Sequence, residues 1–421
     1  MATTQFQTFT GREYLKIDIA NSYGLDKKRW RERISWFDEN QDKLEDLIKD
    51  AEEPALFFAG VQAWRQVERG EPIGYPVSLD ATSSGLQLLA CLTGDRKAAE
   101  LCNVVDFVNQ QGGLDFSTKA EAERRDGYTV IYNYMTNLIG EKSKIAREDV
   151  KQAIMTSLYG SEAVPKEIFG EGNLLAIFHE VMSDLAPGAW ELNKAFLSMW
   201  NPNATIYEWT MPDNFHVKTK VMDTVKNTIH LLNAPYEVLT KVNQAKDEGR
   251  SLGANSTHSV DGMVVREVVR RCNYDKEQLL NVKTALCEKT DQLEEENEKS
   301  RMLATILDLY KSSGFLSMRI VDFIDCNTVA IMTEAEKEAV WRLLSELPTK
   351  PFEVLTVHDC FRVLPNYGND LRKQYNHILS HIAKSNMLEF LIEQITGKQI
   401  KITKLDPEMW KDVLTANYSL S

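Results

Sequence analysis

The chain has 421 residues, of which 43% are hydrophobic and 26% are charged, and its formal net charge is −13. A chain of this length and ordinary globular usage can bury a large core and form more than one lobe. It has no run of about 18 apolar residues and no basic start followed by an apolar core, so we expect neither a membrane span nor a signal peptide. The six cysteines include no Cys-x-x-Cys pair, so we expect reduced thiols in a cytoplasmic protein, without zinc or disulfides.

The first predicted elements are helices over residues 30–70, where apolar residues such as Ile34, Phe37 and Leu44 recur at helical spacing. A basic run, Lys27–Arg33, overlaps their start. This run is either a solvated helix face or a segment near a triphosphate or nucleic acid. A local basic groove is enough for nucleic-acid binding, so the negative total charge does not exclude it.

Two aspartates, far apart in the chain, each follow a short β-prone run. Val77–Leu79 leads into Asp80, and Leu355–Val357 leads towards Asp359. Alone, each aspartate is more simply explained as a cap of a turn or helix. Together on one sheet they could hold two Mg²⁺ ions, because Mg²⁺ prefers a few carboxylates plus substrate phosphates. That arrangement is typical of a nucleotide polymerase.

Between these aspartates, residues 118–200 are expected to be mostly helical, with one helix over residues 147–160 that ends at Gly160. Four side chains at four-residue steps share one face of this helix: Arg147, Lys151, Met155 and Tyr159. Two cations followed by an aromatic ring suit a nucleoside triphosphate, with the cations on the phosphates and the ring against base and sugar. Without the flanking aspartates, an ordinary amphipathic helix is the simpler interpretation.

Two further segments precede the second aspartate. Short β-prone runs over residues 209–239 predict a short ribbon or hairpin. Residues from about 273 to 350 are expected to form a helical insertion, with residues 279–310 strongly helical and Glu294–Lys299 an exposed charge run. The insertion is either a helical hairpin that docks a partner protein or an addition without a role. Charged helices are usually solvated faces, which favours the second interpretation.

Several motifs resemble, in the same order, those of the single-subunit RNA polymerases of bacteriophages and mitochondria, which are related to family A DNA polymerases. The main segments are Asp80–Gln87 for the first catalytic motif, Arg147–Gly160 for the second, His358–Phe361 for the third, and Ala254–Gly262, whose histidine matches one near the nucleotide sugar. Shorter matches extend the resemblance over nearly the whole chain: Tyr14–Ile17, Gly24–Lys27, Ala59–Gln62 and the tail from Trp410 to Tyr418.

The resemblance implies an α+β fold of the right-hand polymerase type, with palm and fingers, mostly helical around a small antiparallel palm sheet. Residues 1–117 would form the first part of the palm, with the first catalytic motif at 77–87. Residues 118–257 would form the fingers. Residues 258–421 would form the second part of the palm, including the helical insertion and the C-terminal tail.

The resemblance also implies roles for single residues in a DNA-dependent RNA polymerase that adds ribonucleotides to an RNA 3′-hydroxyl. Asp80 and Asp359 would ligate two Mg²⁺ ions, with help from the carbonyl of Ala81, and His358 would orient the catalytic turn. Substrate contacts would come from Lys27, Arg147 and Lys151 at the phosphates, Tyr159 and His258 at the ribose 2′-hydroxyl, and Met155, Gly85 and Tyr128 around the nucleotide. A buried core position is an equally good interpretation of that last tyrosine.

Departures from the family motifs bear on two alternatives. A family A-like DNA polymerase would carry a glutamate five residues after the first aspartate and a third motif of the form His-Asp-Glu, whereas this chain has Gly85 and Cys360 there. Both departures favour RNA synthesis. The second alternative, a non-catalytic nucleic-acid-binding relative, is disfavoured by the intact catalytic motifs. The family motif often has a basic residue directly after the helix lysine. This chain has Gln152 there, so one backbone or phosphate contact is expected to be missing. The short ribbon over 209–239 argues against the promoter reading that the corresponding family hairpin performs.

The resemblance finally implies partners. Relatives carry an N-terminal promoter-binding domain, a thumb and an Asp-x-x-Gly-Arg segment before this region, and Thr10–Arg12 is too short to replace the last of these. We therefore expect a basic second polymerase subunit that supplies those parts, as in the heterodimeric RNA polymerases of enquatrovirus-type lytic phages. The other expected partners are the DNA template, the RNA product, nucleoside triphosphates and a single-stranded DNA-binding helper protein, without a membrane.

Overall fold

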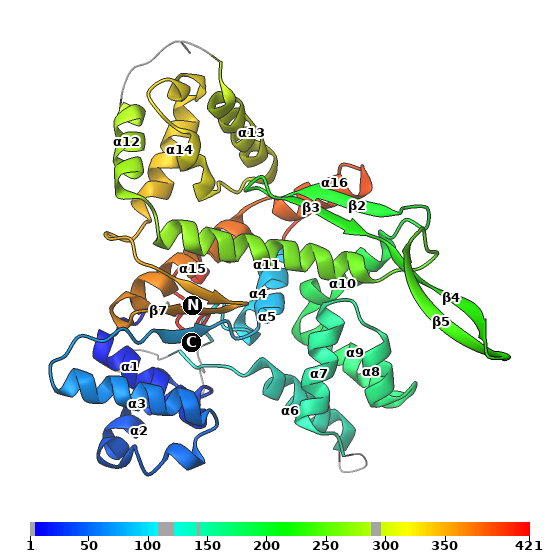
Figure 1. The fold of residues 1–421 in the computed structure, drawn as a ribbon, viewed down its shortest axis with the longest axis horizontal. Helices are drawn as coiled ribbons and strands as arrows, with labels where there is room; N and C mark the ends of the chain where they lie inside the picture. The colour runs from blue at the N-terminus through cyan, green and yellow to red at the C-terminus, as the bar shows by residue number, and fades with distance from the viewer. Residues whose placement is uncertain (1–4, 108–121, 141–143, 288–295) are drawn as a thin grey trace.

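The computed structural model describes residues 5–107, 122–140, 144–287 and 296–421. Within these ranges the chain is mostly helical, with three small antiparallel sheets (Figure 1). The α+β class expected from the sequence is confirmed at this level. The expected boundary at 117–118, and Glu294 and Glu295 of the predicted charge run, lie outside the described residues. No described helix combines the length and apolar character that crossing a bilayer requires.

A three-stranded antiparallel sheet holds the two aspartates together. Its strands are β1 (Val77–Asp80), β7 (Cys360–Val363) and β6 (Leu355–Val357), in the order β1-β7-β6. The register pairs Asp80 with Cys360, and the turn that joins β6 to β7 consists of His358 and Asp359. The pairing of β1 with β7 therefore places the ends of two distant segments side by side.

Helices bury one side of this sheet. The helix that follows the first aspartate, α4 (Ser84–Thr93), is buried along its whole length. It packs against α15 (Gly368–Lys384), whose apolar stripe faces the main core. The other helices near this layer are α5 (Arg96–Leu101), α16 (Met387–Thr396) and α17 (Trp410–Val413). The last residues of the chain are buried, and Leu420 forms an antiparallel bridge with Ala81.

The N-terminal helices predicted for residues 30–70 are present, with an additional helix before them. They are α1 (Gly11–Ala20), α2 (Trp30–Asn40) and α3 (Pro54–Glu68), and 3-10 turns interrupt the chain between α2 and α3. Thr10 and Glu13 form a capping box at the start of α1, and Pro54 occupies the first turn of α3, where its missing N–H costs nothing. Trp30 and Phe37 are fully buried in the main core.

A lobe of five helices follows: α6 (Gly127–Ile139), α7 (Arg147–Leu158), α8 (Ala163–Phe169), α9 (Asn173–Leu185) and α10 (Pro187–Ser198). The helix predicted over residues 147–160 is α7, which ends two residues earlier. Tyr159 caps it, and Gly160 has a φ of +82°, a left-handed conformation that favours glycine.

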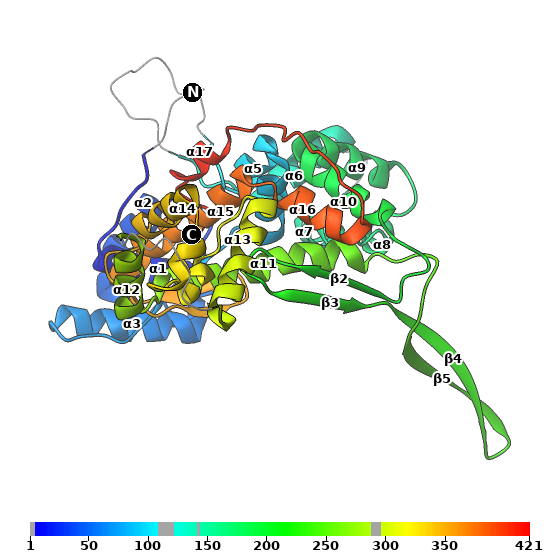
Figure 2. The same cartoon turned by 90° about the horizontal axis from the view of Figure 1, so that it is seen from above.

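The β region is larger than predicted. It comprises two ribbons, β2 (Ile206–Thr210) with β3 (His216–Lys220), and β4 (Met222–Leu231) with β5 (Ala234–Asn243). The expectation of one short hairpin over 209–239 was therefore wrong in extent. Strands β4 and β5 each have 10 residues, and their ribbon projects away from the body (Figures 1 and 2). The polar residues within these strands mask the strand pattern, because both faces of the ribbon are solvated.

A long helix, α11 (Ser251–Cys272), runs across the molecule and leads into the inserted unit, residues 273–350. Helices were predicted over residues 279–310, and the structure has two there, α12 (Lys276–Cys287) and α13 (Glu298–Ser313). A third helix, α14 (Glu334–Ser345), follows. These helices and the turns between them bury a second hydrophobic cluster, around Val282, Ile306 and Val340, that is separate from the main core. The chain returns beside its exit point, where the N–H of Phe352 donates to the carbonyl of Cys272 at 2.8 Å.

Candidate active site

A cavity of about 560 Å³ lies between the sheet, the N-terminal helices and the five-helix lobe. Asp80 reaches it from the end of β1 and Asp359 from the β6–β7 turn, and the N–H of Ala81 donates to the carbonyl of Asp359 at 3.2 Å. Ten of the predicted site residues line this cavity: Lys27, Asp80, Ala81, Gly85, Tyr128, Arg147, Lys151, Met155, Tyr159 and Asp359. The structure thus brings together residues from five separate segments of the sequence.

The two predicted histidines lie outside this lining. His358 is exposed and has a φ of +56°, so it occupies the left-handed position of the two-residue turn that presents Asp359. His258, on α11, stacks on Tyr159 with 4.6 Å between the ring centroids. His258 therefore contacts the site through a residue of the cavity wall, whereas His358 shapes the backbone that carries a carboxylate.

The carboxylates of the site repel one another. Burial, and next the charge of Asp359, raise the pKa of Asp80 to about 6. The same two causes raise the pKa of Asp261, on α11, to about 6. Carboxylate oxygens and a backbone carbonyl are the ligands that Mg²⁺ prefers, and a divalent cation would relieve this repulsion. The donor set at the junction of β1 and β7 therefore fits the predicted Mg²⁺.

The cations of the site differ in how far they are engaged. Arg147 forms an ion pair with Asp126, a 2.7 Å pair with Glu148 and a 2.7 Å hydrogen bond to Thr129 Oγ1. Lys151 forms no ion pair with any described residue, and its Nζ lies 5.9 Å from the ring centroid of Tyr128. Lys151 is therefore the cation of α7 that is ready to receive an anion, whereas Arg147 would have to exchange protein partners for a phosphate.

The residues of the basic run Lys27–Arg33 do not all support the same interpretation, because one faces the cavity, others are exposed to solvent and one is buried. Lys27 lines the cavity, as the triphosphate interpretation requires. Lys28 and Arg31 are exposed, whereas Arg33 is fully buried and donates to the backbone carbonyls of Asp26 and Lys28.

Gly85 and Tyr159 fit closely together. A Cβ atom at Gly85 would lie 3.0 Å from the Tyr159 hydroxyl and 3.2 Å from its Cζ. A side chain at position 85 would therefore press on the tyrosine ring, which lies between α4 and His258, and would force it to shift. Tyr128, for which a core position was an equally good interpretation, is half-buried, lines the cavity and makes a 3.2 Å hydrogen bond with Ser83.

Sequence reasoning missed several residues of the site. Arg124 lines the cavity and donates from Nε to the Ser421 hydroxyl at 3.1 Å, and the Ser421 N–H donates to the carbonyl of Asp80 at 2.9 Å. Asp18, buried on α1, accepts hydrogen bonds from Tyr75 and from the N–H of Ser78 on β1. The dibasic pair before the Asp-Gly-Tyr segment was a usable signal for Arg124. Nothing in the sequence placed the tail beside β1.

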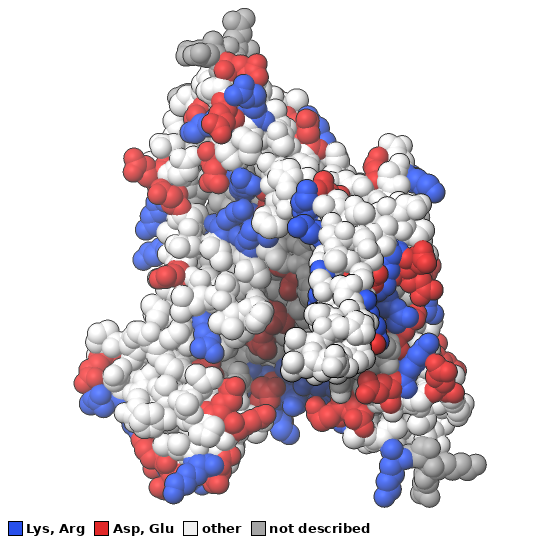
Figure 3. Space-filling view, turned by 45° about the vertical axis from the view of Figure 1, so that its right-hand side comes forward, with Lys and Arg blue, Asp and Glu red and all other residues white. Residues whose placement is uncertain are grey.

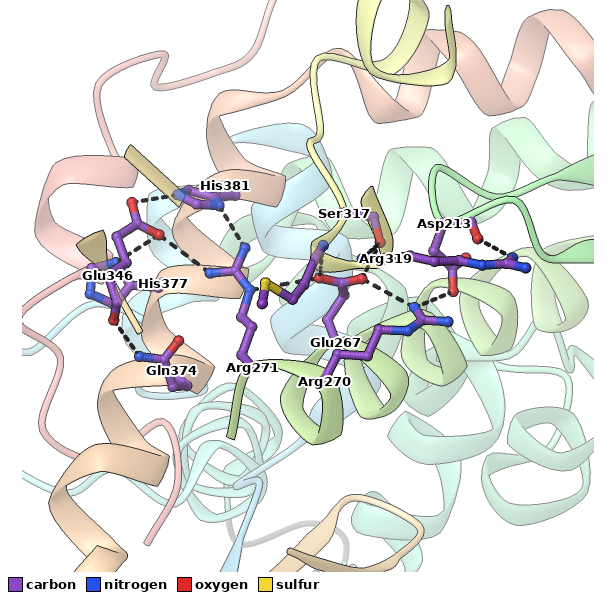
Figure 4. Close-up of polar contacts among 11 residues, drawn as sticks. Asp213, Glu267, Arg270, Arg271, Ser317, Arg319, Glu346, Gln374, His377 and His381 are labelled. Carbon is purple, nitrogen blue, oxygen red and sulfur yellow. Dashed lines mark hydrogen bonds and ion pairs between the residues drawn. The ribbon is translucent and has the colours of Figure 1, made fainter. Parts of the chain in front are cut away.

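A second polar cluster lies away from the cavity, where α14, α15 and α11 meet (Figure 4). Glu346, His377 and His381 offer ligand atoms that lie within 4.8 Å of one another. However, the buried Arg271 donates to His381 Nδ1 at 3.1 Å, so the proton of that imidazole resides on Nε2, which points at Glu346. A protonated Nε2 cannot bind a metal. We therefore interpret the cluster as a hydrogen-bonded latch.

Part of the chain that carries this site is similar to a known protein family. Residues 7–169 match the family model described as DNA-dependent RNA polymerase. This segment carries β1 with Asp80 and the whole of α7. Over this segment the chain is similar to DNA-dependent RNA polymerases. The predicted relationship to RNA polymerase enzymes is thereby confirmed over this segment, whereas Asp359 and His258 lie beyond it.

Three curated relatives illustrate the similarity. A probable DNA-directed RNA polymerase of Neurospora crassa is 31% identical over 160 residues, which is 36% of this chain and 18% of the relative. The DNA-directed RNA polymerase of Pseudomonas phage phiKMV is 29% identical over 181 residues, 36% of this chain and 21% of the relative. A probable DNA-directed RNA polymerase of Gelasinospora sp. (strain G114) is 23% identical over 244 residues, 53% of this chain and 27% of the relative. The chain spans about a fifth to a quarter of the length of these relatives.

Proposed function

We propose that this protein is the catalytic chain of a DNA-dependent RNA polymerase, which adds ribonucleotides to an RNA 3′-hydroxyl. The observation that carries the proposal is the juxtaposition of Asp80, at the end of β1, and Asp359, in the β6–β7 turn. Both face a cavity that is also lined by Lys151 on α7 and by Tyr159 at its end. Sequence similarity to RNA polymerases over residues 7–169 supports it. The sheet and flanking helices would be the palm, and α6 to α10 the fingers.

In this proposal each group of the cavity has a role in nucleotidyl transfer. Asp80 and Asp359 would hold two Mg²⁺ ions, which when bound would lower the pKa of the attacking hydroxyl and stabilise the leaving oxygen. Lys151 and Lys27 would neutralise charge on the departing pyrophosphate, and Arg147 would join them once it exchanges Asp126 for a phosphate. Catalysis would then be mainly positioning and electrostatics.

Sugar selection would come from Tyr159 and His258. Their rings stack, and the Tyr159 hydroxyl occupies the space above Gly85. A glutamate at position 85, as in the alternative of a family A-like DNA polymerase, would clash with this ring. The close fit supports the choice of RNA synthesis over DNA synthesis.

The test is primer extension with ribonucleotides on a DNA template. Asp80→Asn and Asp359→Asn remove a negative charge each with little change in shape, and we expect each to lower the rate of extension by a factor of about 10³ or more. Asp308→Asn, at an aspartate whose side chain is 77% exposed on α13, is the control and should extend normally. Near-normal extension by either active-site variant would contradict the metal-site assignment. Loss of extension with retained nucleic-acid binding in the wild-type chain would favour the non-catalytic alternative.

The second subunit predicted from the family resemblance is part of the proposal. A partner that carries a thumb and an N-terminal domain, and that is basic, would offset the net charge of −13. Adding a co-expressed partner should raise extension on a pre-opened template. If this chain alone transcribes duplex DNA from a promoter, the partner is not needed.

A further inference from the structure

An arginine cluster lies where the turn between β2 and β3, α11 and the inserted unit meet. It consists of Arg266, Arg270 and Arg319, gathered around Asp213. Figure 4 shows Arg270 and Arg319 beside Asp213. The Asp213 carboxylate is fully buried and accepts from Arg266 Nε at 2.6 Å, Arg266 Nη2 at 3.0 Å and Arg270 Nη1 at 2.9 Å. Arg319 Nη1 donates to the backbone carbonyl of the same residue at 2.8 Å.

These contacts fix one edge of each guanidinium and leave the other edge unused. One terminal nitrogen of each guanidinium has no acceptor among the described residues, and none of these nitrogens is buried. They are Nη1 of Arg266, Nη2 of Arg270 and Nη2 of Arg319. The side chains of Arg266 and Arg270 are 27% and 26% exposed. A guanidinium that is already held in place loses little conformational entropy when it binds a further anion, so the cluster is organised for a ligand.

Two of the carboxylates that pair with the cluster are withdrawn from solvent. The side chains of Asp213 and Glu267 are fully buried, so the partly exposed guanidinium groups, with the charge of Asp322 nearby, form the accessible part of the cluster. Figure 3 shows basic side chains gathered above the acidic part of the hollowed face.

An exposed aromatic ring accompanies the cluster. Phe215 is 48% exposed, and the guanidinium carbon of Arg266 lies 4.2 Å from its ring centroid. The backbone holds the ring in place, because the Met211 N–H donates to the Phe215 carbonyl at 2.9 Å and Asn214 adopts a left-handed φ of +57°. Fork-shaped donors beside an open ring match a phosphate next to an unstacked base. An acidic peptide would use the arginines and leave the ring without a partner.

We propose that Phe215 and the arginine cluster form a binding site for single-stranded nucleic acid, distinct from the nucleotide cavity. The phosphates would bind to Arg266, Arg270 and Arg319, and a base would stack on Phe215. Arg266 follows His258 by eight residues on α11, which is about 12 Å along the helix axis. A strand that enters or leaves the proposed active site can therefore reach the cluster. The inference rests on the proposed function only for the identity of that strand.

Two variants test the site without exposing a buried charge. Phe215→Ala removes the open ring. Arg319→Gln removes a cation that donates to the backbone carbonyls of Asp213 and Asn214 and not to the Asp213 carboxylate. The matched controls are Phe58→Ala, a phenylalanine that is 49% exposed on α3, and Arg342→Gln, whose side chain is 66% exposed on α14. Thermal midpoints within the range of the controls establish that the variants fold.

Binding is measured by fluorescence anisotropy with a labelled oligothymidylate of about 20 nucleotides, longer than the roughly 4–16 nucleotides of a typical single-strand site. We expect Phe215→Ala to weaken binding about fivefold or more, and less for the matching duplex. We expect Arg319→Gln to weaken it roughly fivefold and to reduce the slope of log affinity against log salt by about 0.7. The two control variants should bind like the wild type.

Parallel primer-extension measurements separate this inference from the proposed function. If the wild type extends primers and the Phe215 and Arg319 variants bind the oligonucleotide as the controls do, the site is refuted and the polymerase proposal stands. If extension fails but binding depends on both residues, the site stands without the polymerase. Equal loss of duplex and single-strand affinity in Phe215→Ala would refute base stacking, and no binding by the wild type would refute the site.

Discussion

At the scale of single residues, the closest fit in the cavity is between Gly85 and Tyr159. The tyrosine ring lies over the glycine and against His258, and Ser84 is the polar neighbour of its hydroxyl. In the proposed polymerase a hydroxyl held in this way would discriminate between sugars, because a ligand that lacks the partner group leaves a buried polar atom unpaired.

We therefore expect Tyr159→Phe to keep ribonucleotide addition but to lower its preference for ribonucleotides over deoxynucleotides by about tenfold, the equivalent of one hydrogen bond. The ratio of the two incorporation rates on one primed template measures this preference. Tyr134→Phe, at a tyrosine that is 40% exposed on α6, is the control. An unchanged ratio in Tyr159→Phe would remove this residue from sugar selection.

At the scale of elements, α11 connects parts of the molecule that are distant in sequence. Glu267, in its last turns, accepts from the Met318 N–H at 2.9 Å and from the Ser317 hydroxyl, so it binds the inserted unit. Arg271 continues the network to Glu346 at 3.3 Å and to His381 on α15 (Figure 4). Breaking a buried charge network of this kind is costly, because the remaining charge loses its compensation.

The latch between α14 and α15 makes stability depend on pH. The pKa of His377 is lowered to about 4, mainly by burial. The charge of Glu346 opposes this shift, and the charges of Arg271, His381 and Lys373 add to it. The folded state therefore binds fewer protons than the unfolded state between the ordinary histidine pKa of about 6.5 and a pH of about 4. Stability should be fully present above this window and should fall by about 1–3 kcal/mol as the pH falls through it.

The measurement is the thermal midpoint or urea midpoint at pH 7.5 and at pH 5. We expect His377→Asn to be less sensitive to this change of pH than the wild type, because it removes the group that gains a proton on unfolding. His230→Asn, at an exposed histidine on the projecting ribbon, should keep the wild-type pH dependence. Equal slopes in all three proteins would show that the latch does not titrate.

At the scale of the whole molecule, the inserted unit has its own hydrophobic cluster and leaves and returns at one point. The Cys272 carbonyl and the Phe352 N–H are 2.8 Å apart, so a short linker can join the two ends. Glu267 keeps Arg270 and Arg271 as partners without the insertion. The unit therefore has the geometry of an addition to a fold that can stand without it.

We expect a variant in which a linker of about four glycine and serine residues replaces residues 273–350 to fold and to keep ribonucleotide addition. Its thermal midpoint should fall by roughly 10 °C, because the deletion removes Phe315 from the main core and Glu346 from Arg271. Circular dichroism and primer extension measure these properties. The variant lacks Arg319, so its affinity for the labelled oligonucleotide should fall as in Arg319→Gln. An insoluble product, or one without a cooperative transition, would mean that the insertion belongs to the core.

Local pattern was enough to predict the pieces of this protein. The spacing of apolar and charged residues predicts the strand before Asp80, the shared face of α7 and the helices of the inserted unit. Each of these depends on neighbours within a few positions. The full length of the β4–β5 ribbon was not predicted, because both its faces are solvated and its strands carry no regular apolar alternation.

Tertiary structure alone decided which pieces meet. The pairing of β1 with β7 sets Asp80 beside Asp359, the chain end lies against Asp80, and Arg147 is engaged by Asp126 while Lys151 is not. The arginine cluster draws on three segments around one buried carboxylate. Such contacts join residues hundreds of positions apart, and the free energy that selects them comes from burial and charge pairing in the folded core, which no local window of sequence contains.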